Sequence, residues 1–189
     1  MMISDKDFKR GNMNFIRNVF FEKRLLFLDC QIDASGGLAY YNDITMPFRW
    51  SSSPRSIVDQ IIFLDSLNHE PIKLMIDSPG GMVSAYLTLY DIMSASRSPI
   101  YTVASGVVAS AAVPILMSGK VGHRYIFPNS RVMIHMPQSR FGGDPAQVDN
   151  QVKEFKKIKD TYINILSRHT GKTPDQIEQD INRLEFWMN

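Results

Sequence analysis

The chain has 189 residues, a hydrophobic fraction of 44% and a formal net charge of +2. This length fits one domain with a substantial core, and the composition argues against disorder. The small net charge argues against a dedicated nucleic-acid binder, because phosphate binding needs a dense basic face.

The single cysteine, Cys30, excludes an intramolecular disulfide and a cysteine-rich zinc site. The first residues lack the apolar core of a signal peptide, and the longest apolar run, over 107–117, is too short to span a bilayer. We therefore expect a soluble, cytoplasmic protein with no membrane partner.

The first third of the chain is irregular. Residues 1–14 are polar and are expected to form a flexible N-terminal segment, followed by a short helix over 15–20. The compact apolar run 25–30 predicts a buried strand. Residues 33–53 break this pattern with glycines, aromatic residues and serines, and are expected to form a loop excursion. Loops of this length are usually functional or mobile.

Strands and helices alternate after this excursion, which predicts an α/β domain with a mainly parallel sheet. Ser53 followed by Pro54 predicts the start of the first long helix. The elements expected next are a strand over 72–76, a helix from Val83, a strand over 100–104, a helix opened by Ser110, and short strands over 125–127 and 131–134. No domain linker is evident, so residues 1–189 are expected to form a single domain.

The longest predicted helix starts at Asp144-Pro145 and ends before Gly171. Apolar residues line one face of this helix from Val148 to Leu166. An apolar stripe of this length needs another apolar surface to pack against. Thr173-Pro174 and the glutamine at 176 then form a capping box for a final short helix.

Three blocks carry the chemistry. Ser110 lies among small, apolar neighbours at a turn into a helix, and His135 closes a strand-like run that Pro137 prevents from continuing. A Ser78-Pro79-Gly80-Gly81 turn precedes both. These residue types can supply a nucleophile, a general base and an oxyanion hole.

Each block alone has an ordinary structural explanation. A small serine is usually packing, a strand-end histidine is usually a hydrogen-bonded structural residue, and a diglycine is usually only a turn. The remaining histidines, His69, His123 and His169, make no metal-ligand spacing with Cys30 or with one another, so no metal is expected.

In this order and at these spacings, the three blocks resemble the Clp protease family of serine peptidases. The resemblance implies a spiral of repeated ββα units of the Clp and crotonase type, with a mainly parallel sheet and a protruding handle helix. It places the nucleophile at Ser110 and the base at His135. The backbone oxyanion donors fall at Gly81 and Ala111, where glycine permits close approach and N–H groups at a helix start are unsatisfied.

The acid that would orient His135 departs from the family pattern. In the family an aspartate follows an arginine, and an aromatic residue comes shortly after. Here the upstream match places Leu184 at the position of the aspartate, whereas the downstream match places Glu185 there. Glu185 is the first candidate and Asp180 the second. The third alternative is that no carboxylate reaches His135.

Two more departures concern the substrate groove and the chain end. Ser139-Arg140 stands where the family usually has a glycine pair, with Gly142-Gly143 slightly later. The sequence also stops at Asn189, where family members continue into further elements.

The resemblance implies an ATP-dependent serine endopeptidase that hydrolyses unfolded polypeptides inside two stacked heptameric rings. An AAA+ unfoldase would feed these rings, and no cofactor is implied. The main alternative is a catalytically weak or inactive structural subunit of a mixed ring. An acyl-CoA enzyme of the crotonase type and a membrane-linked signal-peptide peptidase fit less well, because the serine–histidine spacing is that of a peptidase and neither a nucleotide motif nor a membrane segment is evident.

Overall fold

The fold is known from a computed structural model, which describes residues 19–33, 54–182 and 185–188. The expected flexible segment 1–14 and the loop excursion, from residue 34 onward, lie outside the described residues. Of the helix predicted over 15–20, only its end is described, where residues 19–22 are helical. The single-domain organisation of residues 1–189 stays a prediction.

Six strands form one sheet in the spatial order β1-β2-β3-β5-β6, with β4 also paired to β3. All pairs are parallel except β5 with β6, which confirms the predicted mainly parallel sheet. The strands are β1 (Leu25–Leu28), β2 (Ile72–Ser78), β3 (Ile100–Ala109), β4 (Arg124–Ile126), β5 (Arg131–Ile134) and β6 (Phe186–Met188).

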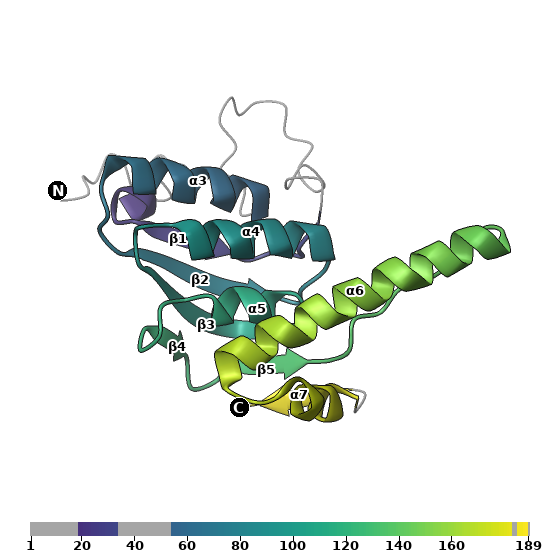
Figure 1. The fold of residues 1–189 in the computed structure, drawn as a ribbon. Helices are drawn as coiled ribbons and strands as arrows, with labels where there is room; N and C mark the ends of the chain where they lie inside the picture. The colour runs from purple at the N-terminus through teal and green to yellow at the C-terminus, as the bar shows by residue number, and fades with distance from the viewer. Residues whose placement is uncertain (1–18, 34–53, 183–184, 189) are drawn as a thin grey trace, which may run out of the picture.

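The helices pack next to one another in chain order. α3 contacts α4, α4 contacts α5, α5 contacts α6, and α6 contacts α7. Figure 1 shows α3 and α4 side by side over the sheet, with α5 next to β3. The helices are α3 (Pro54–Leu67), α4 (Val83–Ala95), α5 (Ala112–Met117), α6 (Pro145–Thr170) and α7 (Pro174–Ile181).

The core lies between this helical layer and the sheet. β2 alternates between buried and more exposed residues, as a strand with one face on the core should. Its buried Ile72, Leu74 and Ile76 join the apolar residues of α3 and α4 in one continuous cluster. Burial of this apolar surface is the main favourable contribution to folding.

The structure corrects the predicted boundaries around the nucleophile. The strand predicted over 100–104 continues to Ala109, and the helix that Ser110 was predicted to open begins at Ala112. The strand is longer because β3 changes partners along its length: residues 102–104 pair with β4, whereas residues 107–109 pair with β5. Ser110 therefore lies in the turn between a strand and a helix.

α7 begins with the predicted capping box, and α6 begins at the predicted residue with a second capping box that the sequence analysis did not identify. The Asp144 and Thr173 side chains each accept a hydrogen bond from the amide three residues later, and the glutamine at that position completes the capping box. β6 was not predicted from the sequence, since three residues carry too little periodicity to indicate a strand.

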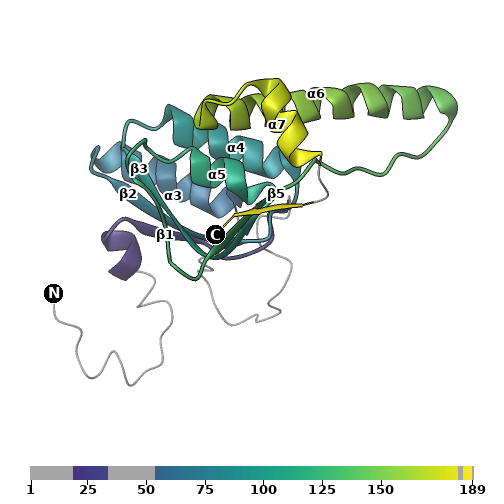
Figure 2. The ribbon, with the colours of Figure 1, turned by 90° about the horizontal axis from the view of Figure 1, so that it is seen from below.

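α6 is longer than the body that it packs on. Its buried residues all lie in its C-terminal half, at Tyr162, Ile163, Ile165 and Leu166. The N-terminal half projects away from the sheet and the other helices in both views (Figures 1 and 2). The segment 136–144 returns along this half, where the Gln151 side chain hydrogen-bonds both to the amide and to the carbonyl of Gly142.

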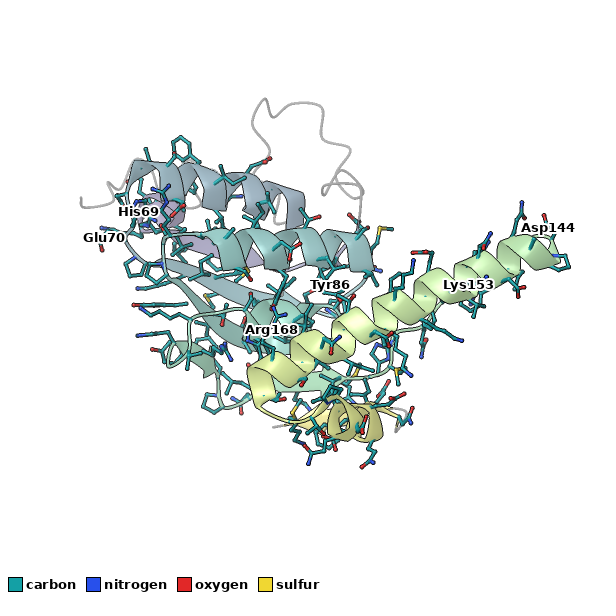
Figure 3. All side chains as sticks on the ribbon, in the orientation of Figure 1. His69, Glu70, Tyr86, Asp144, Lys153 and Arg168 are labelled. Atoms are coloured by element: carbon teal, nitrogen blue, oxygen red, sulfur yellow. The ribbon has the colours of Figure 1, made fainter. Side chains whose placement is uncertain are left out.

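Polar contacts fix the C-terminal end of α3. The Arg24 guanidinium donates to the carbonyls of Leu64 and Glu70 at 3.0 and 2.8 Å. The Asp65 carboxylate accepts from the Ser98 amide at 2.6 Å. His69 and Glu70, labelled in Figure 3, lie at this end of the molecule. These bonds join α3 to β1 and to the turn before β3.

We expect Asp65→Asn to destabilise the fold in a pH-dependent way. Partial burial raises the pKa of the Asp65 carboxyl, but hydrogen bonds from Ser98, Arg97 and His69 outweigh it, and the pKa is lowered to about 2. An unfolded aspartate titrates near 3.9. The stabilisation is therefore present above about pH 4 and is lost as the pH falls toward 2.

Because solvent partly screens this carboxylate, the free energy of unfolding of the wild type should exceed that of Asp65→Asn by about 1 kcal/mol at pH 7. Urea unfolding at pH 7 and pH 3 measures this free-energy difference. Asp59→Asn, at an exposed position of the same helix, is the control. A wild-type advantage that is equal at both pH values would contradict the assigned role of the charge.

Candidate active site

Ser110 has an unusual backbone. Its φ of 54° lies in the left-handed region, a backbone conformation that a residue with a Cβ adopts only at an energetic cost. Its amide donates to the carbonyl of Met133 at 2.9 Å, which fastens the turn to β5. The serine side chain is thereby presented at the carboxyl end of β3, half-buried rather than sealed in the core. Strain of this kind concentrates at functional sites.

The diglycine turn packs directly against this serine. A Cβ at Gly80 would lie 2.5 Å from the Ala109 carbonyl oxygen and 2.8 Å from the Ala111 nitrogen, so a side chain there would collide with backbone. The buried Ser78 hydroxyl accepts from the Gly80 amide at 3.2 Å and donates to the Cys30 carbonyl at 2.6 Å. Glycine is required here because its backbone must touch the turn of the nucleophile.

His135 follows the last residue of β5 and contacts the predicted nucleophile. Its Nε2 lies 2.8 Å from the Ser110 Oγ. In the tautomer with the proton on Nδ1, Nε2 accepts the serine proton, which is the geometry of a general base. The structure thus brings together the two residues that the sequence placed in these roles.

The two predicted oxyanion donors lie beside this pair. Gly81 and Ala111 both line the cleft that contains Ser110 and His135. Neither backbone amide donates to another residue in the described part of the chain. Free N–H groups next to a nucleophile are suited to stabilise the negative oxygen of a tetrahedral intermediate.

The cleft has a volume of about 430 Å³ and is lined mainly by apolar groups. It is formed by the diglycine turn, the start of α4, the Ser110 turn, the end of β5 and the middle of α6. Its lining includes Pro79, Val83, Tyr86, Met133, Pro137 and Tyr162. The sequence pattern placed Tyr86 and Tyr162 on apolar helix faces. Their spacing alone does not show that these faces border the site.

The two candidate acids have other partners in this structure. The Glu185 carboxylate accepts from the Trp187 indole at 2.9 Å, and the Asp180 carboxylate accepts from Lys172 at 2.5 Å. Within the described residues, Ser110 is the hydrogen-bond partner of the His135 ring. The structure therefore joins the serine and the histidine but does not join either carboxylate to them.

The pairing of β5 with β6 ends one residue short of His135 and Glu185. Ile134 pairs with Phe186, and His135 and Glu185 are the next residues outside the two strands. Trp187 lies under the Arg131 guanidinium, at 4.3 Å, which holds the indole beside this edge.

The other histidines are remote from the cleft lining. His169, near the end of α6, contacts the Tyr90 hydroxyl at 2.9 Å and the Arg124 guanidinium at 3.1 Å. Burial, and then the charges of Arg124 and Arg168, lower its pKa.

No group of three or more histidine, cysteine or acidic residues in the described ranges could hold a metal ion. No helix of these ranges is long and apolar enough to cross a bilayer.

Comparison with known proteins identifies the family. The profile of the Clp protease family matches residues 44–189, which is most of the chain. The chain belongs to the Clp protease family. An ATP-dependent Clp protease proteolytic subunit from Carsonella ruddii (strain PV) is 42% identical over 130 residues, covering 69% of this chain and 67% of that protein.

Family membership confirms the predicted Clp-type fold and the assignment of the chain as a serine-type Clp endopeptidase subunit. It does not favour the inactive structural subunit. The roles of the individual site residues rest on the geometry described above and are developed as proposals below.

Proposed function

We propose that Ser110 of this Clp-type peptidase subunit attacks the scissile carbonyl of a polypeptide, with His135 as general base. The observation that carries this proposal is the 2.8 Å contact between His135 Nε2 and Ser110 Oγ, in a cleft beside two backbone amides that have no partner among the described residues. His135 takes the hydroxyl proton as the Oγ–carbon bond forms. It then returns that proton to the leaving amine as the peptide bond breaks.

The amides of Gly81 and Ala111 stabilise the oxyanion that forms during this attack. Water then hydrolyses the acyl-enzyme by the same route, with His135 again accepting and returning a proton. The chemistry requires no cofactor, since each step moves only protons and electron pairs between substrate, water and these side chains.

Glu185 is proposed as the group that orients His135. Its place one residue before β6, which pairs with the strand that His135 follows, supports this role. In this role, the Glu185 carboxylate exchanges the Trp187 indole for His135 Nδ1. A carboxylate there selects the tautomer that leaves Nε2 free, and it stabilises the imidazolium.

Assembly into stacked heptameric rings is proposed to act through the projecting half of α6. Val148, Val152 and Phe155 on this half are only partly covered in the subunit, as is Ile158 just beyond it. Exposed apolar residues also gather around β4, where Tyr125, Ile126 and Phe127 are about half exposed. Exposed apolar surfaces of this kind indicate contacts with further chains.

The partner and substrate are proposed from the relative and the cleft. The name of the C. ruddii relative describes the proteolytic subunit of an ATP-dependent protease. By analogy, an AAA+ unfoldase supplies this subunit with unfolded polypeptides, in the cytoplasm. The open, mainly apolar cleft suits an extended chain rather than a folded surface.

Ser110 should react covalently with a fluorophosphonate probe, because His135 activates its hydroxyl. Ser110→Ala should abolish labelling and lower peptide hydrolysis by roughly 10⁴-fold or more. In-gel fluorescence and a fluorogenic peptide assay on the assembled protein measure both, with Ser105→Ala as a control on the same strand. Labelling that persists in Ser110→Ala would overturn the assignment, and an unreactive but assembled wild type would indicate a structural ring subunit.

Glu185→Gln should lower turnover by roughly 10²- to 10⁴-fold, because a neutral amide does not stabilise the imidazolium. Asp180→Asn removes a carboxylate that is bound to Lys172 and should change turnover little. Size-exclusion chromatography establishes that both variants assemble. Full activity in Glu185→Gln would show that the serine and histidine act as a dyad.

Phe155→Asp should prevent assembly, since it places a charge on the apolar side of the projecting helix. The ring of Phe155 contacts Phe141 within the subunit, at 5.6 Å between centroids. Lys153→Asp introduces the same side chain at an exposed position of α6, labelled in Figure 3, and is the matched control. Sedimentation velocity distinguishes the variants. Rings of wild-type size in Phe155→Asp would contradict the proposed role of this helix.

A further inference from the structure

Asp77, the residue of β2 just before Ser78 and the diglycine turn, bonds to the neighbouring strand through its side chain. Its carboxylate Oδ1 accepts a hydrogen bond from the Val107 amide of β3 at 3.0 Å. β2 and β3 are parallel neighbours that lie side by side in the sheet (Figure 1). A regular parallel ladder uses backbone groups alone, so this side-chain bond marks an irregular place in the sheet.

The pairing of β2 with β3 is interrupted at Asp77 by a bulge in β3. Ile76 pairs with Ala104, but Ser78 pairs with Val108, so β3 advances by four residues where β2 advances by two. A bulge leaves backbone groups of the longer strand without their ladder partners. The Asp77 carboxylate replaces the missing partner of the Val107 amide.

The carboxylate packs directly against the backbone of this bulge. The φ of Gly106 is 64°, in the left-handed region, and a Cβ there would lie 2.6 Å from each of the two Asp77 carboxylate oxygens. Only glycine tolerates both the backbone conformation and the close approach. The position of the carboxylate and the path of β3 are therefore tied to each other.

The bulge decides which residue of β3 reaches the diglycine turn. If the pairing of Ile76 with Ala104 continued without interruption, Ser78 would pair with Gly106 instead of Val108. The faces of β3 keep their orientation, because the shift is by two residues and side chains alternate with a period of two. The shift brings Ser110 to Gly80, where a Cβ would lie 2.8 Å from the Ser110 Cβ.

The bulge also lies where β3 exchanges its neighbour on the other side. β3 pairs with β4 up to Ala104 and with β5 from Val107 onward. The pairing with β5 sets Ala109 beside Met133, and this register places the turn of the nucleophile next to the strand that His135 follows. Asp77 thus holds the first residue of the β3 segment that leads to Ser110.

We propose that Asp77 is a positioning residue for Ser110: by accepting from the Val107 amide, it fixes the β3 bulge and so the distance between Ser110 and His135. This inference rests on the proposed peptidase function. Asp77 is exposed and is not among the described residues that line the cleft. It acts through the backbone of β3 as a hydrogen-bond acceptor, without contact to the reacting atoms.

The test compares three substitutions of Asp77 in the assembled enzyme with a fluorogenic peptide. Asp77→Ala removes the acceptor and should lower kcat roughly 10- to 100-fold with KM little changed, because a displaced nucleophile costs rate rather than binding. Asp77→Asn keeps an oxygen acceptor and should retain kcat within about threefold of the wild type. Asp77→Glu keeps the charge but adds a methylene against Gly106, and should lower kcat as alanine does.

Lys73→Ala, at another exposed position of β2, is the matched control and should leave kcat unchanged. Size-exclusion chromatography and thermal unfolding measure the assembly and the Tm of each variant. A merely structural Asp77 would lower the Tm of Asp77→Ala and leave the kcat of the assembled enzyme at the wild-type value, which would overturn the proposal. An equal loss of kcat in Asp77→Asn and Asp77→Ala would also overturn it. If Asp77→Ala does not assemble, Asp77→Glu decides, and a wild-type kcat in that variant contradicts the proposal.

Failure of the peptidase function would instead appear as a wild type without Ser110-dependent hydrolysis. In that case, crystal structures of the wild type and of Asp77→Ala decide the inference. The distance between His135 Nε2 and Ser110 Oγ is 2.8 Å in the wild type. In Asp77→Ala it should exceed the hydrogen-bond limit of about 3.2 Å, and an unchanged distance would overturn the inference.

Discussion

The left-handed backbone of Ser110, held by a hydrogen bond to Met133, is the constraint on which the site depends. Because the chain turns at this residue, the serine hydroxyl leaves β3 toward the end of β5, where His135 lies. The same turn sets the Ala111 amide beside the nucleophile. Gly80 must lack a side chain because its backbone packs into this turn at a distance that a Cβ would close. One strained residue thus places the Ser110 hydroxyl and the Ala111 amide, the proposed nucleophile and one proposed oxyanion donor, side by side.

The sheet explains why the Ser110 and His135 side chains meet. β3 and β5 are parallel neighbours, and their register places Ala109 beside Met133. Ser110 is one residue after Ala109, and His135 is two residues after Met133. Carboxyl ends of neighbouring parallel strands gather functional side chains at one edge in many α/β enzymes. β6 adds Glu185 to the same edge by antiparallel pairing, although its carboxylate is bound to the Trp187 indole.

α6 links this edge to the outer surface. Its C-terminal half packs on the core and supplies Tyr162 to the cleft, while its N-terminal half projects beyond the body. A contact made by the projecting half therefore acts on the same rigid element that lines the site. The segment 136–144, which starts at the catalytic strand end, also runs along this half. The proposed assembly surface and part of the cleft wall therefore lie on one helix.

The sequence by itself determined the alternation of strands and helices, the capping box of α7, and Ser110, His135 and the diglycine turn as the candidate site. These features are local, because spacing, capping residues and glycine turns act within a few positions of the chain. The spacing of Tyr86 and Tyr162 likewise showed that each lies on an apolar helix face. It did not show that the two faces meet at the active site, 76 positions apart by subtraction of their numbers.

Only the tertiary structure decided the contacts between such distant segments. β3 runs five residues past its predicted end because β5 becomes its partner there, and β6 exists because β5 offers an edge to pair with. The acid position shows the same limit. Aligning the flanks of Glu185 gave a candidate, but its place near the end of β5 follows from the pairing of β6 with a strand about 50 positions upstream.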